Sequence, residues 1–183
     1  MVSNLRRLCL VGVRGVGKTT LLKSVLPRLP RVEHIVGSAV LRELAGPDFV
    51  RFDFLPASSK VAYRQKAIVW MERRQAASQR HLLCDGHTAL LDESTGRVES
   101  VFTASDCGFF RELILMEGPE DLILRRRQGD TSKRRSLNPS VIAAELEAER
   151  RTAHAISAQW GLTLHSLPSE PVAAAERLVE ILS

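Results

Sequence analysis

The sequence has few aromatic residues and no long apolar run. Aromatic residues make up 5% of the 183 residues, and they do not alternate with basic ones as on surfaces that bind single-stranded nucleic acid, so we expect no nucleic-acid partner. No segment approaches the ~20 apolar residues of a membrane helix. The first residues lead into a strand-like segment instead of a secretion signal. We therefore expect a cytoplasmic protein without a membrane segment.

Cysteine is also scarce, which excludes a disulfide framework. Cys9, Cys84 and Cys107 are odd in number and far apart, and two of them lie in apolar runs. This is typical of buried thiols in a reducing compartment, and we expect no disulfide. A metal site made by Cys84, His87 and Cys107 is an alternative, although these residues lack the paired spacing of zinc ligands.

The two motifs that read guanine nucleotides are missing. No Asp is followed by Gly three residues later, and neither Asn4 nor Asn138 is followed by Lys. A GTPase with D-x-x-G and N-K-x-D is therefore excluded. An ATP-binding regulatory protein or ATPase stays open.

The sequence does contain alternating short apolar runs and longer helical stretches, a pattern typical of a parallel sheet covered by helices on both faces. We expect strands at 8–11, 34–36, 81–85, 113–116 and 161–165, and a loop at 92–106. We expect helices at 18–28, 57–79, 118–129, 138–160 and 170–182. The buried faces of the two long helices are predicted from two apolar stripes, Ala57, Val61, Ile68 and Met71, and Ile142, Leu146, Ala153, Ile156 and Trp160.

The strongest motif runs from Gly12 to Thr20 and matches G-x-x-x-x-G-K-[ST] between a strand and a helix. Its glycines let the backbone curl so that N–H groups point at phosphate oxygens, helped by the helix dipole. Lys18 brings a mobile cation to the outer phosphates, and the Thr19 hydroxyl is placed to ligate Mg²⁺. The predicted ATP-binding residues here are Gly12, Arg14, Gly15, Val16, Gly17, Lys18, Thr19 and Thr20.

Two polar residues follow the third expected strand. Asp85 ends that strand, where a carboxylate can join the Mg²⁺ shell or accept the proton of a reacting hydroxyl. Its alternative role is to cap the next turn. His87 either contacts the phosphoryl acceptor or holds the loop in place.

The net charge of +5 is concentrated in residues 125–135, which hold six cations and Asp130 as their one anion. Six close cations repel one another, and arginine donates in a fork to phosphoryl oxygens, so we expect this segment to fold over a triphosphate. The alternative is that residues 125–135 form a solvent-exposed basic surface without a ligand. Arg126 and Arg135 are the candidate catalytic cations, and Arg126 is also a candidate ATP ligand.

The order of these motifs resembles the compact, archaeal-type adenylate kinases within the nucleoside monophosphate kinases, over nearly the whole chain. The Asp85-Gly86-His87 turn is similar to the family's Asp-Thr-His, and Arg151 with the Ala-rich stretch 153–158 resembles the helix that returns catalytic cations to the site. The family's short lid is matched by Arg126, Asp130-Thr131, Lys133 and Arg135.

The resemblance implies an α/β fold of the P-loop NTPase type, a three-layer sandwich with helices around a five-stranded parallel sheet in the order 2-3-1-4-5. Residues 1–183 would form a single P-loop kinase domain, with an acceptor-binding helical region at about 37–80 and a lid at about 127–137. The implied activity is an ATP- and Mg²⁺-dependent phosphotransferase acting on a nucleoside monophosphate. Arg151 joins Lys18, Asp85, Arg126 and Arg135 as a catalytic residue.

The acceptor half departs from the family pattern. Gly37 fits the family's Tyr-Gly-Asp, but Ser38 stands where the family has Asp, and Asp53 stands where an acceptor-binding Arg is expected. Arg42, Arg51 and Arg64 are candidates to replace that Arg. The expected acceptor-binding residues are Gly37, Ser38, Arg42, Arg64 and His87.

These departures leave the phosphoryl acceptor open. The alternative to a nucleoside monophosphate is another small molecule with a hydroxyl group, for which Asp85 would act as base. A phosphate acceptor would need no base. The sequence does not indicate an oligomeric state.

Overall fold

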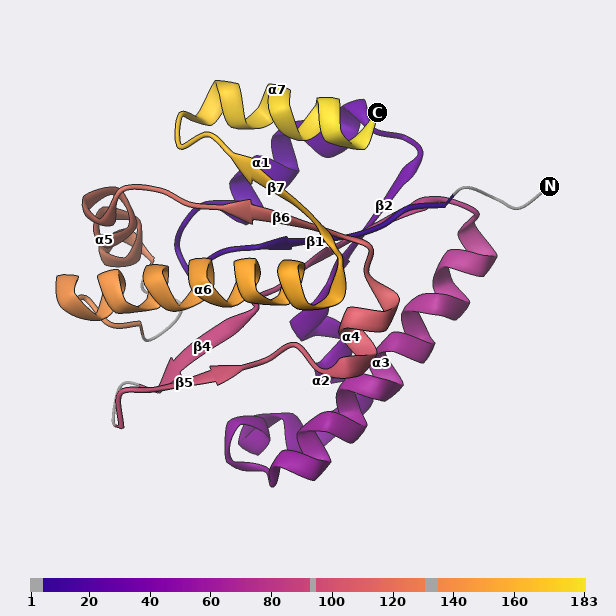
Figure 1. Cartoon of the computed structure of the whole chain (residues 1–183), viewed down its shortest axis with the longest axis horizontal. Helices are drawn as coiled ribbons and strands as arrows, with labels where there is room; N and C mark the ends of the chain where they lie inside the picture. Colours follow the sequence, from indigo (N-terminus) through magenta and orange to yellow (C-terminus); the bar gives the residue numbers. More distant parts are fainter. Residues whose placement is uncertain (1–4, 93–94, 131–134) are drawn as a thin grey trace.

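A central sheet of five parallel strands organises the chain. The computed structural model describes residues 5–92, 95–130 and 135–183. The strand order is β2-β3-β1-β6-β7 (Figure 1), which in chain order of the five strands is the predicted 2-3-1-4-5. The α/β fold class is thereby confirmed. The strands are β1 (Arg7–Val11), β2 (Val32–Val36), β3 (His81–Asp85), β6 (Glu112–Met116) and β7 (Thr163–Leu167).

Alternation along the strands produces a core on each face of the sheet. Leu8 and Leu10 of β1 pack with α1 (Lys18–Val25) and α7 (Pro171–Leu182) on one face. Cys9 and Val11 point to the other face, which is covered by α2 (Gly37–Ala45), α3 (Ala57–Ser78), α4 (Ala104–Phe109) and part of α6 (Pro139–Trp160). Figure 1 shows the resulting three layers.

Local residue chemistry sets the helix ends. The Asn138 side chain accepts the Ser140 N–H at 2.9 Å and starts α6, and Gly161, with φ of 68°, ends it. Because Gly161 ends the helix, β7 begins at Thr163, two residues later than predicted. The helix expected at 18–28 is α-helical to Val25 and continues as a 3₁₀ turn, Leu26–Arg28, which contains Pro27. Helix α5 (Glu120–Gly129) ends where the sequence predicts.

The prediction of a loop at residues 92–106 was wrong. An antiparallel hairpin of β4 (Ala89–Asp92) and β5 (Arg97–Ser100) packs along α6, and α4 follows. All four β5 residues are exposed, so this strand lacks the apolar alternation that marks a strand in sequence. Helix α4 starts with a capping box in which Thr103 and Asp106 bond reciprocally.

Parts of both long helices, α3 and α6, differ from their predicted burial. Ala57 and Val61 are exposed, because the first half of α3 projects beyond the sheet (Figure 1). This half of α3 contacts the 3₁₀ segment Gly46–Phe54 through the ring pair Phe52 and Tyr63. Trp160, placed by its spacing on the buried face of α6, is 46% exposed.

The three cysteines are free thiols and buried.

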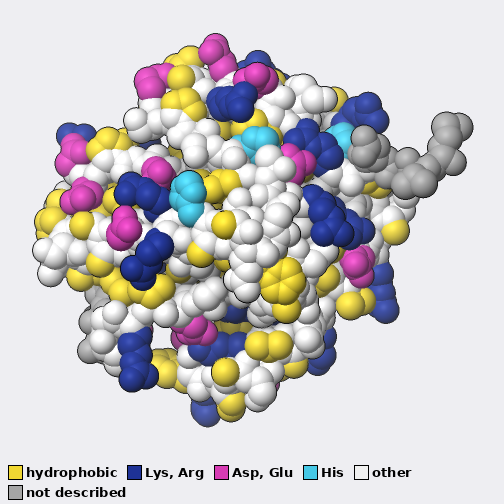
Figure 2. Space-filling view, viewed as in Figure 1, with side chains coloured by type: hydrophobic (Ala, Val, Ile, Leu, Met, Phe, Trp, Pro, Cys, Tyr) yellow, Lys and Arg dark blue, Asp and Glu magenta, His cyan; other side chains and the backbone are white. Residues whose placement is uncertain are grey.

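Within residues 5–92, 95–130 and 135–183, no helix combines the length and apolar character needed to span a bilayer. On the face seen in Figure 2, basic and acidic side chains are interspersed.

Candidate functional site

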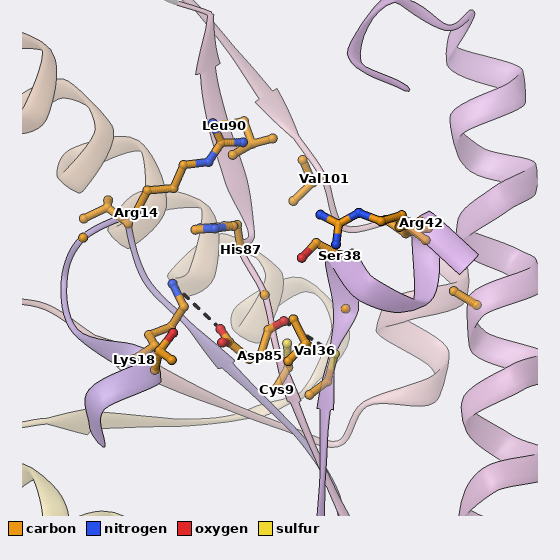
Figure 3. Close-up of a pocket in the computed structure, with 18 of the residues that line it drawn as sticks. Cys9, Arg14, Lys18, Val36, Ser38, Arg42, Asp85, His87, Leu90 and Val101 are labelled. Atoms are coloured by element: carbon orange, nitrogen blue, oxygen red, sulfur yellow. Dashed lines mark hydrogen bonds and ion pairs between the residues drawn. The ribbon is translucent and has the colours of Figure 1, made fainter. Parts of the chain in front are cut away.

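A cavity of about 830 Å³ opens at the carboxyl edge of the sheet. It is lined by the loop after β1, by residues following β3, by α2 and α3, and by the end of α5 with Arg135. Figure 3 shows Lys18 and Asp85 on one side of this cavity and Ser38 and Arg42 of α2 on the other. Ligands commonly bind at this edge of a parallel sheet.

The loop between β1 and α1 has the backbone of a phosphate-binding loop. Gly12 and Gly17 have φ values of 152° and 112°, which side-chain-bearing residues rarely adopt. Val13 and Val16 are buried and anchor the loop in the core, and Val16 N–H donates to the Val13 carbonyl at 3.2 Å. Thr19 and Thr20 are exposed at the start of α1.

Lys18 is the charged centre of the loop. Its ammonium donates to the Gly12 carbonyl and lies 4.0 Å from Asp85 Oδ1, and the residue is 8% exposed. Burial lowers the pKa of Lys18 from its ordinary value, while Asp85 and Glu149 oppose that shift. A buried cation with this few partners is poised to take an anionic ligand.

Asp85 and His87 extend the site from the end of β3. The sheet positions this segment through the Gly86 N–H, which donates to the Leu10 carbonyl at 3.0 Å. Burial, reinforced by Lys18 and Arg14, holds the pKa of His87 well below its ordinary value of 6.5. The imidazole is therefore neutral at physiological pH and can accept or donate a hydrogen bond without adding charge.

Of the arginines predicted in the lid, Arg126 reaches the loop and Arg135 lines the cavity. The Arg126 guanidinium donates to the Val16 carbonyl, and a Cβ at Gly17 would lie 2.8 Å from Arg126 Nη1. Arg135 pairs with Asp130 at 3.1 Å, and its buried Nε has no hydrogen-bond partner among the described residues. Thr131 and Lys133, also predicted in the lid, lie outside the described residues.

Arg127, which sequence reasoning missed, connects the end of α5 to the phosphate loop. It is 4% exposed and donates to the Arg14 carbonyl from Nε and Nη2, at 3.0 and 2.8 Å, and to the Ser136 carbonyl at 3.1 Å. It also pairs with Glu145 of α6. The run of three arginines gives no signal for this, because only the rotation of α5 decides which one is buried.

Glu149 of α6 is the second residue that was missed. Its carboxylate is buried and accepts backbone N–H bonds from Gly12, Thr88 and Ala89. A signal was present in the sequence, since Glu149 falls between Leu146 and Ala153 in the predicted apolar stripe. A charge inside such a stripe indicates a buried polar contact.

The opposite wall is formed by α2, α3 and the aromatic residues between them. Gly37, Ser38 and Arg42 line the cavity from α2, and the Arg42 guanidinium carbon lies 5.0 Å from the centre of the Phe49 ring. Arg64 of α3 also lines it and donates to the Val101 carbonyl. This wall therefore offers two guanidinium groups beside apolar surface.

Most predicted site residues line this cavity. The three that do not are Gly12, Val16 and Arg151. Gly12 and Val16 are buried beneath the loop surface. The lining residues that were predicted are Arg14, Gly15, Gly17, Lys18, Thr19, Thr20, Gly37, Ser38, Arg42, Arg64, Asp85, His87, Arg126 and Arg135. Of the candidates to replace the family's acceptor-binding arginine, Arg42 and Arg64 face the cavity, and Arg51 is exposed and does not line it.

Arg151 is the predicted catalytic residue that the fold keeps away from the cavity. It is exposed on α6 and does not line the cavity. Two residues along a helix turn the side chain by about 200°, so Arg151 points away from the direction in which Glu149 reaches the loop. Arg151 therefore lies outside the cavity, and its predicted catalytic role gains no support from this geometry.

The residues present fit a magnesium nucleotide. A triphosphate would find backbone N–H donors in the glycine-rich loop and cations in Lys18, Arg126 and Arg135. The oxygen ligands that Mg²⁺ prefers are present in Thr19 and Asp85. The described residues contain no cluster of three or more His, Cys, Asp or Glu suited to a metal ion, so the Cys84, His87 and Cys107 alternative has no support. Mg²⁺ needs no such cluster, because nucleotide phosphates and water complete its shell.

Three solved structures share this fold. A sugar kinase from Janibacter sp. HTCC2649 aligns over 96% of this chain and 93% of its own at 18% identity, with a TM-score of 0.58. A shikimate kinase from Acinetobacter baumannii, in complex with shikimate, covers 98% and 92% at 17% identity and a TM-score of 0.56. A gluconokinase from Sinorhizobium meliloti 1021 covers 97% and 95% at 19% identity and a TM-score of 0.50.

These likenesses show the fold, and they give the AMP specificity implied by the sequence resemblance no support. No curated protein matches the chain. A family model described as AAA domain (AAA_17) matches residues 11–143, well over half of the chain. The chain therefore belongs to this AAA domain family, and its fold is the one seen in the sugar kinase and the shikimate kinase.

Proposed function

We propose that this protein is an ATP- and Mg²⁺-dependent phosphotransferase whose acceptor is a small molecule with an anionic group. The observation that carries the proposal is one cavity lined both by Lys18 and Asp85 and by the arginines of α2 and α3. Figure 3 shows Lys18 and Asp85 across from Arg42 of α2. A protein that only bound ATP would need no second wall with two guanidinium groups beside the phosphate loop. Donor and acceptor sites that share one cavity are what direct phosphoryl transfer requires.

The donor half would act by positioning and charge neutralisation. The backbone N–H groups of the loop hold the phosphates, and Lys18 exchanges its bond to the Gly12 carbonyl for a phosphate oxygen. Arg126 and Arg135 donate to the oxygens of the group in transfer, where negative charge redistributes. Bound Mg²⁺, held by Thr19 and Asp85, would supply further charge neutralisation at the phosphates.

The acceptor half selects the second substrate. Arg42 and Arg64 would bind its anionic group, and Phe49 and Phe52, which also line the cavity, would cover its apolar or ring portion. A nucleoside monophosphate is the first candidate, because it combines a phosphate with a flat base. Its reacting oxygen is already anionic, so no base is needed.

A hydroxyl-bearing acid is the second candidate, favoured by Asp85 beside neutral His87 at the meeting point of the two halves. Here Asp85 would accept the proton of the reacting hydroxyl after Lys18 has moved from its side to the phosphates. The same arginines would hold the carboxylate of such an acid. The two candidates differ in the need for a base, which a variant of Asp85 can test.

The test is a search for acceptor-dependent ADP formation. The protein is incubated with ATP and Mg²⁺, together with each nucleoside monophosphate, AMP first, or with polyhydroxy acids, and products are checked by mass for one added phosphoryl group. We expect ADP formation that needs one acceptor class and is absent in Lys18→Ala. ADP formed equally without any acceptor would favour an ATPase or regulatory protein, and no ADP above the Lys18→Ala background would overturn the proposal.

A further inference from the structure

The carboxylate of Glu149 lies buried where three elements of the site meet. Oε1 accepts the N–H groups of Gly12, at 3.0 Å, and Thr88, at 2.9 Å, and Oε2 accepts the N–H of Ala89 at 3.0 Å. The Thr88 hydroxyl also donates to the Glu149 carbonyl at 3.2 Å. Glu149 is 2% exposed and Thr88 is fully buried. One side chain of α6 thus binds both the start of the phosphate loop and the segment after β3.

These contacts begin where the sheet stops holding its strands together. The Gly86 N–H donates to the Leu10 carbonyl, next to the last paired residues of β1 and β3. Past this point Gly12 and Thr88 have left the strands, and each carries a buried N–H that needs an acceptor. Glu149 supplies that acceptor to both, so one carboxylate bridges the two segments.

Gly12 is held at both of its polar atoms. Its N–H donates to Glu149, and its carbonyl accepts from the Lys18 ammonium. If the proposed function is correct, Lys18 leaves this carbonyl for a phosphate oxygen during the reaction. The bond to Glu149 is then the one of these two that still fixes Gly12 in relation to Asp85 and His87.

Burying a carboxylate is costly, and an apolar residue would suit the stripe between Leu146 and Ala153. The cost is offset here because three N–H groups converge on the two oxygens. We propose that Glu149 is a positioning residue that sets the distance between the Lys18 loop and the Asp85-Gly86-His87 turn. This inference rests on the proposed function for its catalytic consequence, although its structural content does not.

Glutamine is a sharp probe of this arrangement because it keeps the shape of glutamate. Its amide has one oxygen and one N–H₂ group, so one orientation sets that N–H₂ group against Ala89 N–H, and the other sets it against Gly12 and Thr88. Either way donors face donors and at least one buried N–H loses its acceptor. The matched control is Glu147→Gln, the same change on an exposed residue of α6 that pairs with Arg150.

The experiment compares Glu149→Gln and Glu147→Gln with the wild type by steady-state kinetics and by amide hydrogen exchange followed by NMR. In Glu149→Gln we expect kcat to fall roughly tenfold to a hundredfold, as for a misplaced reacting group, with little change in the KM for ATP. Exchange at Gly12, Thr88 and Ala89 should speed up relative to the other amides of β1 and β3. Glu147→Gln should match the wild type in all of these measurements.

A purely structural role would lower the melting temperature of Glu149→Gln and leave kcat unchanged for the folded protein, which would overturn the inference. Unchanged exchange at the three amides would overturn it as well. If Glu149→Gln does not fold, Glu149→Asp carries the test, since it keeps the charge but is one methylene too short to hold all three N–H groups. A wild-type kcat in that variant also overturns the inference.

The outcome can be separated from a failure of the proposed function. If the wild type transfers phosphate to no acceptor, the proposed function fails. The exchange rates of Gly12, Thr88 and Ala89 still decide whether Glu149 holds the two segments together. Faster exchange in Glu149→Gln would then support the positioning role, and unchanged exchange would exclude it.

Discussion

The proposed donor and acceptor halves of the cavity are built from different kinds of structure. The donor half is mostly backbone, one nine-residue segment from Gly12 to Thr20 whose shape follows from its glycines and its place between β1 and α1. The acceptor half is made of side chains from α2, α3 and the 3₁₀ segment between them, brought together by packing. The donor site is therefore set by local sequence, and acceptor choice is set by tertiary structure.

Lys18→Ala should give the largest effect and tests the donor half alone. The backbone of the loop still closes, but the mobile cation is lost, so we expect kcat/KM for phosphoryl transfer to fall roughly a thousandfold. Circular dichroism should show an unchanged fold. The control is Lys23→Ala, on the exposed side of the same helix. Equal turnover in Lys18→Ala and the wild type would refute the assignment of the phosphate loop.

Asp85→Asn probes the boundary between the halves. We expect a loss of activity of roughly a hundredfold, because the change removes either a charge near Mg²⁺ or a proton acceptor. If Asp85 serves the metal, higher Mg²⁺ or Mn²⁺ should restore part of the rate. If it is a base, the variant stays inactive at every metal concentration.

The pH dependence of the wild type sharpens this distinction. A base at Asp85 predicts that the rate falls with acid through a single pKa. His87 does not supply that transition near neutral pH, because burial and the neighbouring Lys18 keep its pKa well below 6.5. A wild-type rate that is flat across the acid range, together with metal rescue of Asp85→Asn, would favour the phosphate acceptor.

Paired arginine variants compare the halves directly. Arg135→Gln should lower kcat more than it weakens ATP binding, because its guanidinium is proposed to meet charge that develops during transfer. Arg42→Gln should instead raise the KM for the acceptor, roughly tenfold to a hundredfold for one lost charged hydrogen bond, with the KM for ATP unchanged.

The controls for this pair are Arg125→Gln, in which the arginine is 68% exposed and pairs with Asp121, and Arg51→Gln, which lies outside the cavity. Both should behave as the wild type. Similar kinetic changes in Arg135→Gln and Arg42→Gln would contradict the division of the cavity into two halves.

The same division explains what the sequence could predict. The strands and the loop were predictable because each rests on a local pattern, an apolar run or a glycine spacing, whereas the strand order was implied by the family resemblance. The hairpin after Asp85 was not, because all four β5 residues are exposed and the strand carries no apolar alternation. Arg127 and Arg151 show the general difficulty, since a helix rotation of one or two residues decides whether an arginine is buried, faces the cavity or points to solvent.

The smallest expected effect lies at the opposite edge of the sheet and should leave both halves unchanged. Glu112, the first residue of β6, bonds Arg6 at 2.8 Å through Oε1 and His165 at 2.9 Å through Oε2. The bond from Arg6 is the largest cause that holds the pKa of Glu112 below its ordinary value of 4.5, despite partial burial.

A carboxylate whose folded pKa is depressed adds stability above its unfolded pKa, and this stability is lost as the pH falls through the lower folded value. The wild type should therefore lose this contribution below a pH of about 4.5, and Glu112→Gln should be less stable near neutral pH but show a smaller loss on acidification. Urea unfolding of the wild type and of Glu112→Gln at neutral and acid pH measures how the free energy of unfolding of each protein changes with pH. The kcat of the variant at neutral pH should equal that of the wild type, because Glu112 lies at the amino edge of the sheet and the cavity lies at the carboxyl edge. An unchanged acid slope would mean that the Arg6 contact does not set the pKa of Glu112, and a reduced kcat would mean that the two edges of the sheet are coupled.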